Sequence, residues 1–224
     1  MCGRYVLSST GERIAEHFGL AQATPVAPRY NIAPTQQAPV VRVARSGERE
    51  LVVLRWGLVP FWAKDLAVGQ RQINARAESL ATRPAYREAF RRRRCLVPAT
   101  GFYEWKPGPR RKQPYLCRLP SGGLFAFAGL WESWRSPEGE VVQTFAIVTA
   151  DASDAIRALH DRMPVIVPES EYGAWLHGEA VERLVAGPSA APLVIEPVGL
   201  AVNNVRNDGP ELVVPMEESG DRLV

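Results

Sequence analysis

The alternation of apolar and polar positions along the chain predicts a fold built mainly from short strands. Valine, leucine, phenylalanine and alanine cluster in brief segments, and glycine, proline and serine separate these segments. The predicted strands cover residues 3–7, 39–43, 51–55, 95–105, 115–119, 124–132, 141–149, 164–167 and 193–200. Because hairpins dominate over strand–helix–strand units, we expect an α+β fold around a largely antiparallel, barrel-like sheet with short flanking helices.

Helical patterns are short and lie between these strands. Ser9 followed three residues later by Glu12 is typical of a capping box, and Gly19 is placed to end the helix that follows. Further helices are predicted over residues 84–94, 151–160, 169–177 and 181–185. No segment is long enough to serve as a linker, so we expect a single domain over residues 1–224 with a loosely defined C-terminal tail.

Composition narrows the class of protein. The 224 residues are 46% hydrophobic and 23% charged, which is typical of a globular domain. Three cysteines, an odd number, argue against a disulfide framework and for a reducing, cytoplasmic compartment. No apolar run approaches the ~20 residues of a membrane span, and the N-terminus lacks the apolar region of a signal peptide. The net charge of +3 is compatible with a polyanionic partner without requiring one.

Cys2 is the first candidate for chemistry. If Met1 is removed, this residue carries both a free α-amine and a thiol. Unperturbed groups of this kind are roughly one-seventh neutral amine and about 3% thiolate at pH 7, so both are available as nucleophiles. The amine can condense with an aldehyde to a Schiff base, and the thiol can then close a thiazolidine ring. The alternative is an incidental cysteine near a frayed end, but the strand predicted over residues 3–7 would anchor it in the fold.

Other candidates are polar residues in apolar or small-residue segments. Glu104 stands among aromatics, where desolvation would raise its pKa for acid–base work; it could also be an outward-facing carboxylate. Asn74 could orient a substrate hydroxyl or cap a helix, and Arg76 could bind a phosphate or form a surface ion pair. His160 follows a predicted helix as a candidate acid or base, and Arg162 is a second candidate for phosphate binding.

Two further kinds of segment bear on a nucleic-acid partner. The loop 56–62 is too apolar for solvent; its aromatics, Trp62 included, could stack on unpaired bases or pack into the core. The basic run 91–94 lies on a predicted helix and is expected to form a solvated face. The run 110–112 follows no pattern that indicates a role.

The remaining cysteines and histidines indicate no metal site. Cys95 and Cys117 lack metal-ligand spacing and are expected to be buried thiols. His17 and His177 lie in predicted helices as surface or packing residues. We therefore expect no metal and no cofactor.

Taken together, seven segments resemble the SRAP family, the SOS-response-associated peptidase-like proteins that process abasic sites. The matching motifs cover residues 1–5, 30–35, 55–60, 74–78, 95–99, 101–105 and 160–164. They occur in the family's order over roughly residues 1 to 200, and the motif residues show no departure from the family pattern. Several independent matches in the right order make the resemblance specific.

The resemblance implies a monomeric sensor that binds single-stranded DNA at an abasic site and links to it covalently, shielding the strand from cleavage. It implies a thiazolidine at Cys2 after Cys2-dependent removal of Met1, to which the peptidase label would correspond. The implied catalytic residues are Cys2, Asn74, Glu104 and His160. The implied DNA-binding residues are Arg4, Arg76, Arg162, Trp62 and Trp105. Replication or repair proteins are conceivable further partners, but no residue pattern identifies one.

Two other classes of function compete with this interpretation. An N-terminal Cys-Gly also begins the glutamine amidotransferase domains of N-terminal-nucleophile hydrolases, in which the thiol attacks an amide. That alternative leaves the segments around Glu104, His160 and Trp62 unexplained, and an assay for ammonia release from glutamine would detect it. A non-catalytic single-strand-binding module, with Cys2 incidental, would give no mass shift on abasic DNA.

Overall fold

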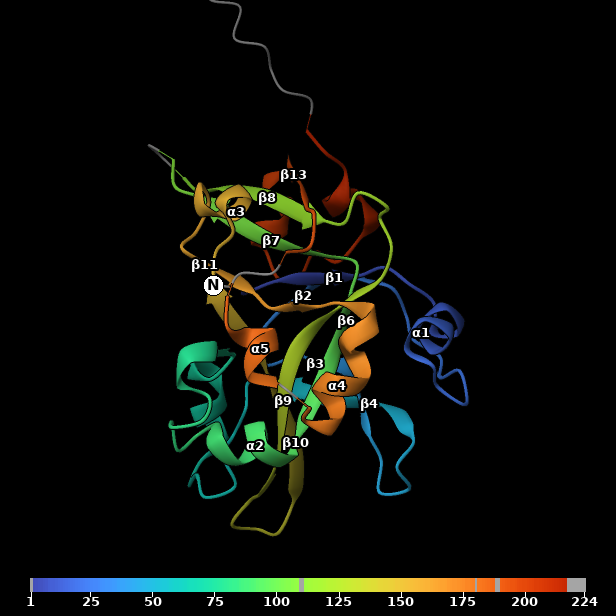
Figure 1. The fold of residues 1–224 in the computed structure, drawn as a ribbon. Helices are drawn as coiled ribbons and strands as arrows, with labels where there is room; N and C mark the ends of the chain where they lie inside the picture. The colour runs from blue at the N-terminus through green and yellow to red at the C-terminus, as the bar shows by residue number, and fades with distance from the viewer. Residues whose placement is uncertain (1, 109–110, 180, 188–189, 217–224) are drawn as a thin grey trace, which may run out of the picture.

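The computed structural model describes residues 2–108, 111–179, 181–187 and 190–216, and its strands form two sheets (Figure 1). The larger sheet contains β3 (Gln37–Val43), β4 (Arg49–Trp56), β5 (Asn74–Arg76), β6 (Arg94–Ala99), β9 (Phe125–Arg135), β10 (Val141–Asp151), β11 (Arg162–Pro164) and β12 (Ile166–Val167). Its order is β11-β10-β4-β3-β6-β9-β12, with β5 on β10. Because β10 also pairs with β9, the strands β10, β4, β3, β6 and β9 close into a barrel.

The smaller sheet covers one end of the barrel (Figure 1). It contains β1 (Tyr5–Leu7), β2 (Arg29–Ile32), β7 (Gly101–Lys106), β8 (Gln113–Arg118) and β13 (Val194–Pro197), in the order β13-β8-β7-β1-β2. Among the described residues, all strand pairings are antiparallel except those of β10 with β4 and with β5. The predicted α+β fold with a largely antiparallel, barrel-like sheet is therefore confirmed.

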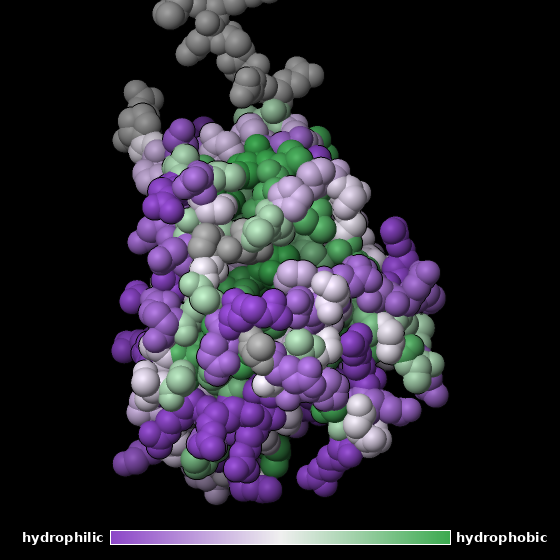
Figure 2. All heavy atoms as spheres, in the orientation of Figure 1, coloured by the Kyte–Doolittle hydropathy of each residue, from purple (hydrophilic) through white to green (hydrophobic). Residues whose placement is uncertain are grey.

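Short helices flank the sheets, as expected. They are α1 (Gly11–Phe18), α2 (Arg87–Arg92), α3 (Asp154–Arg157), α4 (Tyr172–His177) and α5 (Val181–Val185), with 3-10 turns at Leu66–Arg71, Ala77–Ser79, Glu169–Glu171, Leu200–Asn203 and Pro210–Val213. None of the helices in the described residues is long and apolar enough to cross a membrane. In Figure 2, hydrophobic residues gather over the smaller sheet and the middle of the viewed face, and hydrophilic residues dominate its margins and lower end.

The single strand predicted over residues 95–105 is wrong. The chain forms two strands, β6 in the barrel and β7 in the smaller sheet, joined at Thr100, whose backbone N–H donates to Val6 O at 2.8 Å. A continuous apolar pattern cannot show such a change of sheet. The first residue of β7 is a glycine, Gly101. A Cβ atom at this position would stand only 2.9 Å from Leu116 Cδ1, so the close packing favours glycine there.

Several predicted helix bounds are also wrong. The N-cap of α1 is Thr10, not Ser9: the Thr10 hydroxyl accepts from the backbone N–H of Arg13. The helix predicted over 151–160 shrinks to α3, because Asp151 ends β10 and His160 precedes β11. The helix predicted over 84–94 shrinks to α2.

The expected solvated face over residues 91–94 holds only in part. Arg91 and Arg92 are exposed, but Arg93 bonds to buried Glu132 at 2.7 Å. Arg94 is 9% exposed because it begins β6, and its guanidinium donates to backbone carbonyls, including that of Trp175.

Residues 200–216, for which the sequence predicts no structure, pack against the smaller sheet. Val202 and Leu212 join a small core cluster with Tyr103 of β7. The carboxylate of Asp208 accepts from the backbone N–H groups of Tyr30 and Asn31, at 2.5 and 2.7 Å. The C-terminal segment thereby covers β2, a strand the sequence pattern did not indicate.

Candidate functional site

The N-terminal segment is held inside the fold by β1, which pairs with β2 on one side and β7 on the other. Tyr5 lies opposite Phe102, and the backbone N–H of Tyr103 donates to Arg4 O at 3.0 Å. The strand predicted over residues 3–7 is thus confirmed in position. Cys2 is completely buried, so the start of the chain is anchored rather than frayed. Met1 lies outside the described residues.

Asn74 is joined directly to Cys2. It begins β5, where it lies opposite Ile147 of β10, and its Nδ2 donates to Cys2 O at 2.9 Å. Its own backbone carbonyl accepts from the hydroxyl of Tyr86 at 3.0 Å, which fixes the strand end. Asn74 is therefore a strand residue beside Cys2 and not the helix cap that was the alternative interpretation.

Glu104 supplies the acidic group of the site. It is 3% exposed on β7, and burial raises the pKa of its carboxyl above the ordinary 4.5. Burial also raises the pKa of the Cys2 thiol, and the Glu104 charge adds to that effect. The predicted desolvated carboxyl is confirmed, but the Cys2 thiol is far less ionised than an unperturbed thiol would be.

His160 stands between two cavities. Its Nδ1 accepts from the backbone N–H of Arg162 at 2.9 Å and lies 2.7 Å from Asp161 Oδ1. Both contacts use the same ring atom, so Nε2 is the nitrogen left for a substrate. The side chain is 33% exposed, which suits a group that exchanges protons with a ligand.

The first of these cavities has a volume of about 550 Å³. Its lining residues are Arg4, Glu104, Trp105, Arg111, Lys112, His160 and Asn203. Arg4 is fixed there: its Nη1 donates to Asn31 Oδ1 at 3.0 Å and to Val202 O at 2.9 Å. The cavity therefore combines a buried acid with several cations, a setting for a negatively charged ligand.

The second cavity, of about 430 Å³, is lined by Arg76, Asp151, His160, Asp161 and Arg162. Arg76 is exposed at the end of β5. Arg162 is held by both oxygens of Glu78, at 3.0 and 2.9 Å, by Asp151 Oδ1 at 2.9 Å and by Thr149 O at 2.7 Å. A phosphate at Arg162 would compete with these carboxylates, whereas Arg76 forms no salt bridge within the described residues.

Unsatisfied polar atoms gather on the strands beneath this region. Asn74 Oδ1, Thr149 Oγ1 and Arg162 Nε are buried and have no hydrogen-bond partner in the described residues. They belong to β5, β10 and β11, which are neighbours in the sheet. Buried polar groups are normally paired, so a cluster of unpaired ones indicates a place where a ligand or water completes the bonding.

The apolar loop 56–62 divides between core and surface. Trp56 is fully buried, its indole N–H donates to Ile73 O at 2.9 Å, and its ring packs against Tyr5 and Phe145. Trp62 is 54% exposed, and it does not line either of the cavities beside His160. Packing is thus confirmed for one end of the loop, and base stacking by Trp62 stays a prediction.

The side chains of Trp105 and Arg4 are positioned by residues that the sequence analysis missed. The indole N–H of Trp105 donates to Asn203 Oδ1 at 2.8 Å, and the Arg4 guanidinium lies 5.9 Å from the ring centre. Asn31 donates to the carbonyls of Val202, Asn204 and Asn207. The only sequence signal for this arrangement is the run of polar residues at 203–208, which carries no recognisable spacing.

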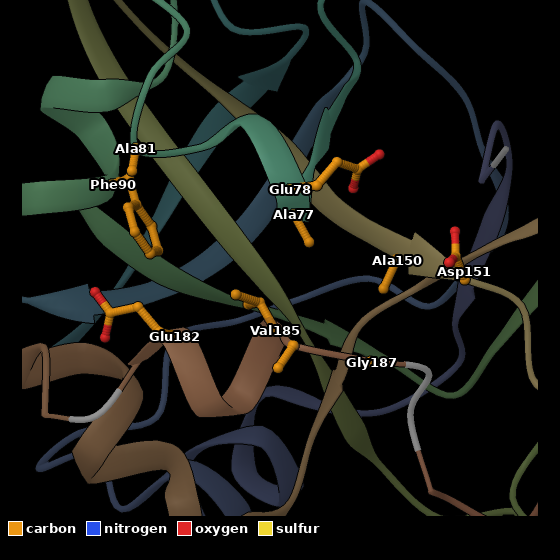
Figure 3. Close-up of a pocket in the computed structure, with 10 residues that line it drawn as sticks. Ala77, Glu78, Ala81, Phe90, Ala150, Asp151, Glu182, Val185 and Gly187 are labelled. Carbon is orange, nitrogen blue, oxygen red and sulfur yellow. The ribbon is translucent and has the colours of Figure 1, made fainter.

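A third cavity shares Asp151 with the second and is lined by three carboxylates (Figure 3). Its volume is about 390 Å³, and Glu78 and Asp151 lie across it from Glu182, with Phe90 and Val185 between them. No cation is among its described lining residues. It is therefore unfavourable for a phosphate. No group of three metal-ligating side chains occurs within the described part of the chain.

The raised pKa of Glu104 carries a prediction for stability. Because the folded state binds the Glu104 proton more tightly, this carboxyl destabilises the fold increasingly as pH rises above about 4.5. Glu104→Gln should therefore raise the melting temperature at pH 7–8, by about 2–4 °C for each kcal/mol gained, and change it little below pH 4.5. Calorimetry across this pH range would check it, and an equal shift at every pH would contradict it.

Comparison with known proteins places these features in a family. Residues 1–205 match the model of SOS response associated peptidase (SRAP). The chain is 39% identical over 222 residues to the abasic site processing protein YoqW of Bacillus subtilis, covering 95% of this chain and 99% of that one. It is 33% identical to the abasic site processing protein HMCES of Gallus gallus, covering 85% of this chain and 67% of that one.

A solved structure agrees with the fold. The crystal structure of a Bacteroides thetaiotaomicron protein superimposes with a TM-score of 0.83 at 23% identity, covering 96% of this chain and all of that one. The match to the family model spans β1, Asn74, Glu104 and His160, the elements that form the Cys2 site. The chain therefore belongs to the SOS response associated peptidase (SRAP) family.

Proposed function

We propose that this protein recognises abasic sites in single-stranded DNA and captures them covalently through Cys2. The observation that carries the proposal is the anchoring of Cys2 beside Asn74 and Glu104, next to a cavity lined by cations. Relatives named for abasic site processing support the choice of substrate. The acid beside an aminothiol suits an aldehyde electrophile, and the cations suit its flanking phosphates.

The first step is opening of the deoxyribose ring. An abasic sugar is a cyclic hemiacetal, so opening needs a base at the C1′ hydroxyl and an acid at the ring oxygen. His160 and Glu104 line one cavity and interact electrostatically, so they can divide these roles. The C1′ aldehyde forms as the C1′–O4′ bond breaks.

The α-amine of Cys2 reacts with the aldehyde before the thiol does. Burial keeps the Cys2 thiol protonated, which disfavours it as the first nucleophile and also disfavours the amidotransferase alternative. The free α-amine of Cys2 adds to C1′, and loss of water gives the Schiff base. The thiol adds to the same carbon as its proton moves to nitrogen, which closes the five-membered thiazolidine. The net reaction joins aldehyde and aminothiol with release of one water.

The mechanism requires Cys2 to be the first residue. We propose that Met1 is removed, and that any peptidase activity of the chain acts on this bond. Asn74 Nδ2 holds the Cys2 carbonyl, and the unpaired Oδ1 can accept from the new α-amine or from a sugar hydroxyl. Asn74 thereby orients the nucleophile toward the cavity.

Intact mass spectrometry after incubation with abasic single-stranded DNA tests the proposal directly. The expected product has the mass of the chain without Met1 plus the oligonucleotide minus one water. An oligonucleotide with a tetrahydrofuran in place of the sugar lacks the aldehyde and serves as the control. A full-yield adduct on protein that retains Met1 would refute the α-amine mechanism, and no adduct at all would leave only a binding module.

Phosphate binding at Arg76 gives a salt-dependent signature. If about three phosphates are neutralised, the slope of log affinity against log salt is roughly −2, and affinity falls about 20-fold from 50 to 200 mM salt. Arg76→Gln should flatten this slope by about 0.7. Arg162→Gln should flatten it similarly if Arg162 also binds a phosphate. Fluorescence anisotropy with tetrahydrofuran-containing DNA measures both, and an unchanged slope would remove that arginine from phosphate binding.

A further inference from the structure

Two cations at the Cys2 cavity are not assigned to a particular phosphate by the mechanism above. Arg111 and Lys112 precede β8 in the loop between β7 and β8, and both are exposed while lining the cavity of Glu104 and His160. Neither forms a salt bridge within the described residues. Arg110, the third member of this basic run, lies outside the described residues. Both described charges are therefore available to an anion.

The neighbouring cation in this cavity behaves differently. The guanidinium of Arg4 is fixed by hydrogen bonds to Asn31 and Val202 and lies over the ring of Trp105. Burial lowers the pKa of Arg4. A fixed, partly buried guanidinium gains from an anion close by, because the anion offsets its lost hydration. Arg111 and Lys112 are instead long, solvated side chains at the cavity rim, which can reach a charged group as it enters.

The arrangement of the three cavities restricts where phosphates can go. His160 lines the cavity of Arg111 and Lys112 and also the cavity of Arg76, so the two cavities meet at its imidazole. The third cavity is rimmed by carboxylates and repels a phosphate (Figure 3). A sugar that reacts beside His160 therefore has Arg111 and Lys112 available to a phosphate in one cavity and exposed Arg76 available to a phosphate in the other.

We propose that Arg111 and Lys112 bind the backbone phosphate on one side of the captured sugar, while Arg76 binds the phosphate on the other. This inference rests on the proposed function and adds to it a second phosphate subsite. The ligand is a DNA phosphodiester, recognised by charge and not by base. The two subsites would stretch the strand across His160 and present C1′ to Cys2.

The test combines the removal of positive charges from the protein with the removal of single negative charges from the DNA backbone. Single-stranded oligonucleotides carry a central tetrahydrofuran, with an uncharged methylphosphonate on its 5′ side, on its 3′ side or on neither. Each is titrated by anisotropy against the wild type, Arg111→Gln/Lys112→Gln and Arg76→Gln. Arg45→Gln/Arg135→Gln is the matched control, because it removes one exposed charge from the β3–β4 turn and one from the end of β9.

The expected result is a crossed pattern. In the wild type and the control, either methylphosphonate weakens binding several-fold. In Arg111→Gln/Lys112→Gln, the methylphosphonate on one side of the tetrahydrofuran no longer weakens binding, whereas the one on the other side still does. In Arg76→Gln, the two sides are exchanged. The salt slope of the double variant flattens by about 0.7, the value for one phosphate contact. Persistence of both penalties, or loss of both, in the double variant would overturn the assignment.

Adduct formation separates this inference from the proposed function. If the wild type forms no adduct, the proposed function fails. If the wild type forms the adduct but the crossed pattern is absent, only the second phosphate subsite fails.

Discussion

Replacing Cys2 with alanine is expected to abolish the stable protein–DNA adduct and to convert the protein into a weak strand-cleaving lyase. Prepared with the new alanine as its first residue, the variant keeps an α-amine, so it still forms a Schiff base at C1′. A Schiff base withdraws electrons and acidifies the adjacent C2′ proton, which leads to β-elimination of the 3′ phosphate. Without the thiol no thiazolidine forms to remove the imine. The thiol therefore protects the strand that the amine has captured.

A denaturing gel of end-labelled abasic DNA measures both outcomes, with borohydride to trap the imine. Cys117→Ala is the matched control, because this thiol is also buried and lies opposite Phe102 on β7, the strand that carries Glu104. The control should form the adduct as the wild type does. If Cys2→Ala gives neither trapped imine nor cleavage above DNA alone, the α-amine is not the first nucleophile, and direct attack by the thiol replaces it.

Glu104→Gln is expected to slow adduct formation by about 100-fold or more, in line with the loss of one general acid–base group. Glutamine keeps the size and burial of the side chain but cannot carry a proton between the sugar and the amine. Reversal of the adduct should slow as well, because the same proton transfers operate in both directions. His160→Ala should slow mainly ring opening, so a substrate already in the aldehyde form would partly rescue it.

Single-turnover time courses on denaturing gels give these rates. Glu132→Gln is the matched control: Glu132 is also a carboxyl with 4% exposure and a raised pKa, but it lies on β9 and pairs with Arg93. It should react at the wild-type rate. A Glu104→Gln variant that forms and reverses the adduct as fast as Glu132→Gln would remove Glu104 from proton transfer.

Much of the site can be predicted from short segments of the sequence. The strand after Cys2, the carboxyl among aromatics at Glu104 and the histidine before Arg162 are short-range patterns, and each lies near the Cys2 site in the folded chain. The barrel-like α+β class also follows from pattern, because short strands joined by tight turns pair mainly with antiparallel neighbours. Cys95 and Cys117 are buried, as their apolar surroundings predict.

The sequence could not determine which strand ends lie together or which partners each polar side chain contacts there. Arg162 faces Glu78 and Asp151, Arg94 is buried under α4, and residues 200–216 close over β2, all through contacts between distant segments. The ionisation of Cys2 likewise depends on burial that only the assembled sheets create. Periodicity along a chain records which side chains turn inward, but register and change of sheet arise from packing between elements, so only the tertiary structure fixes them.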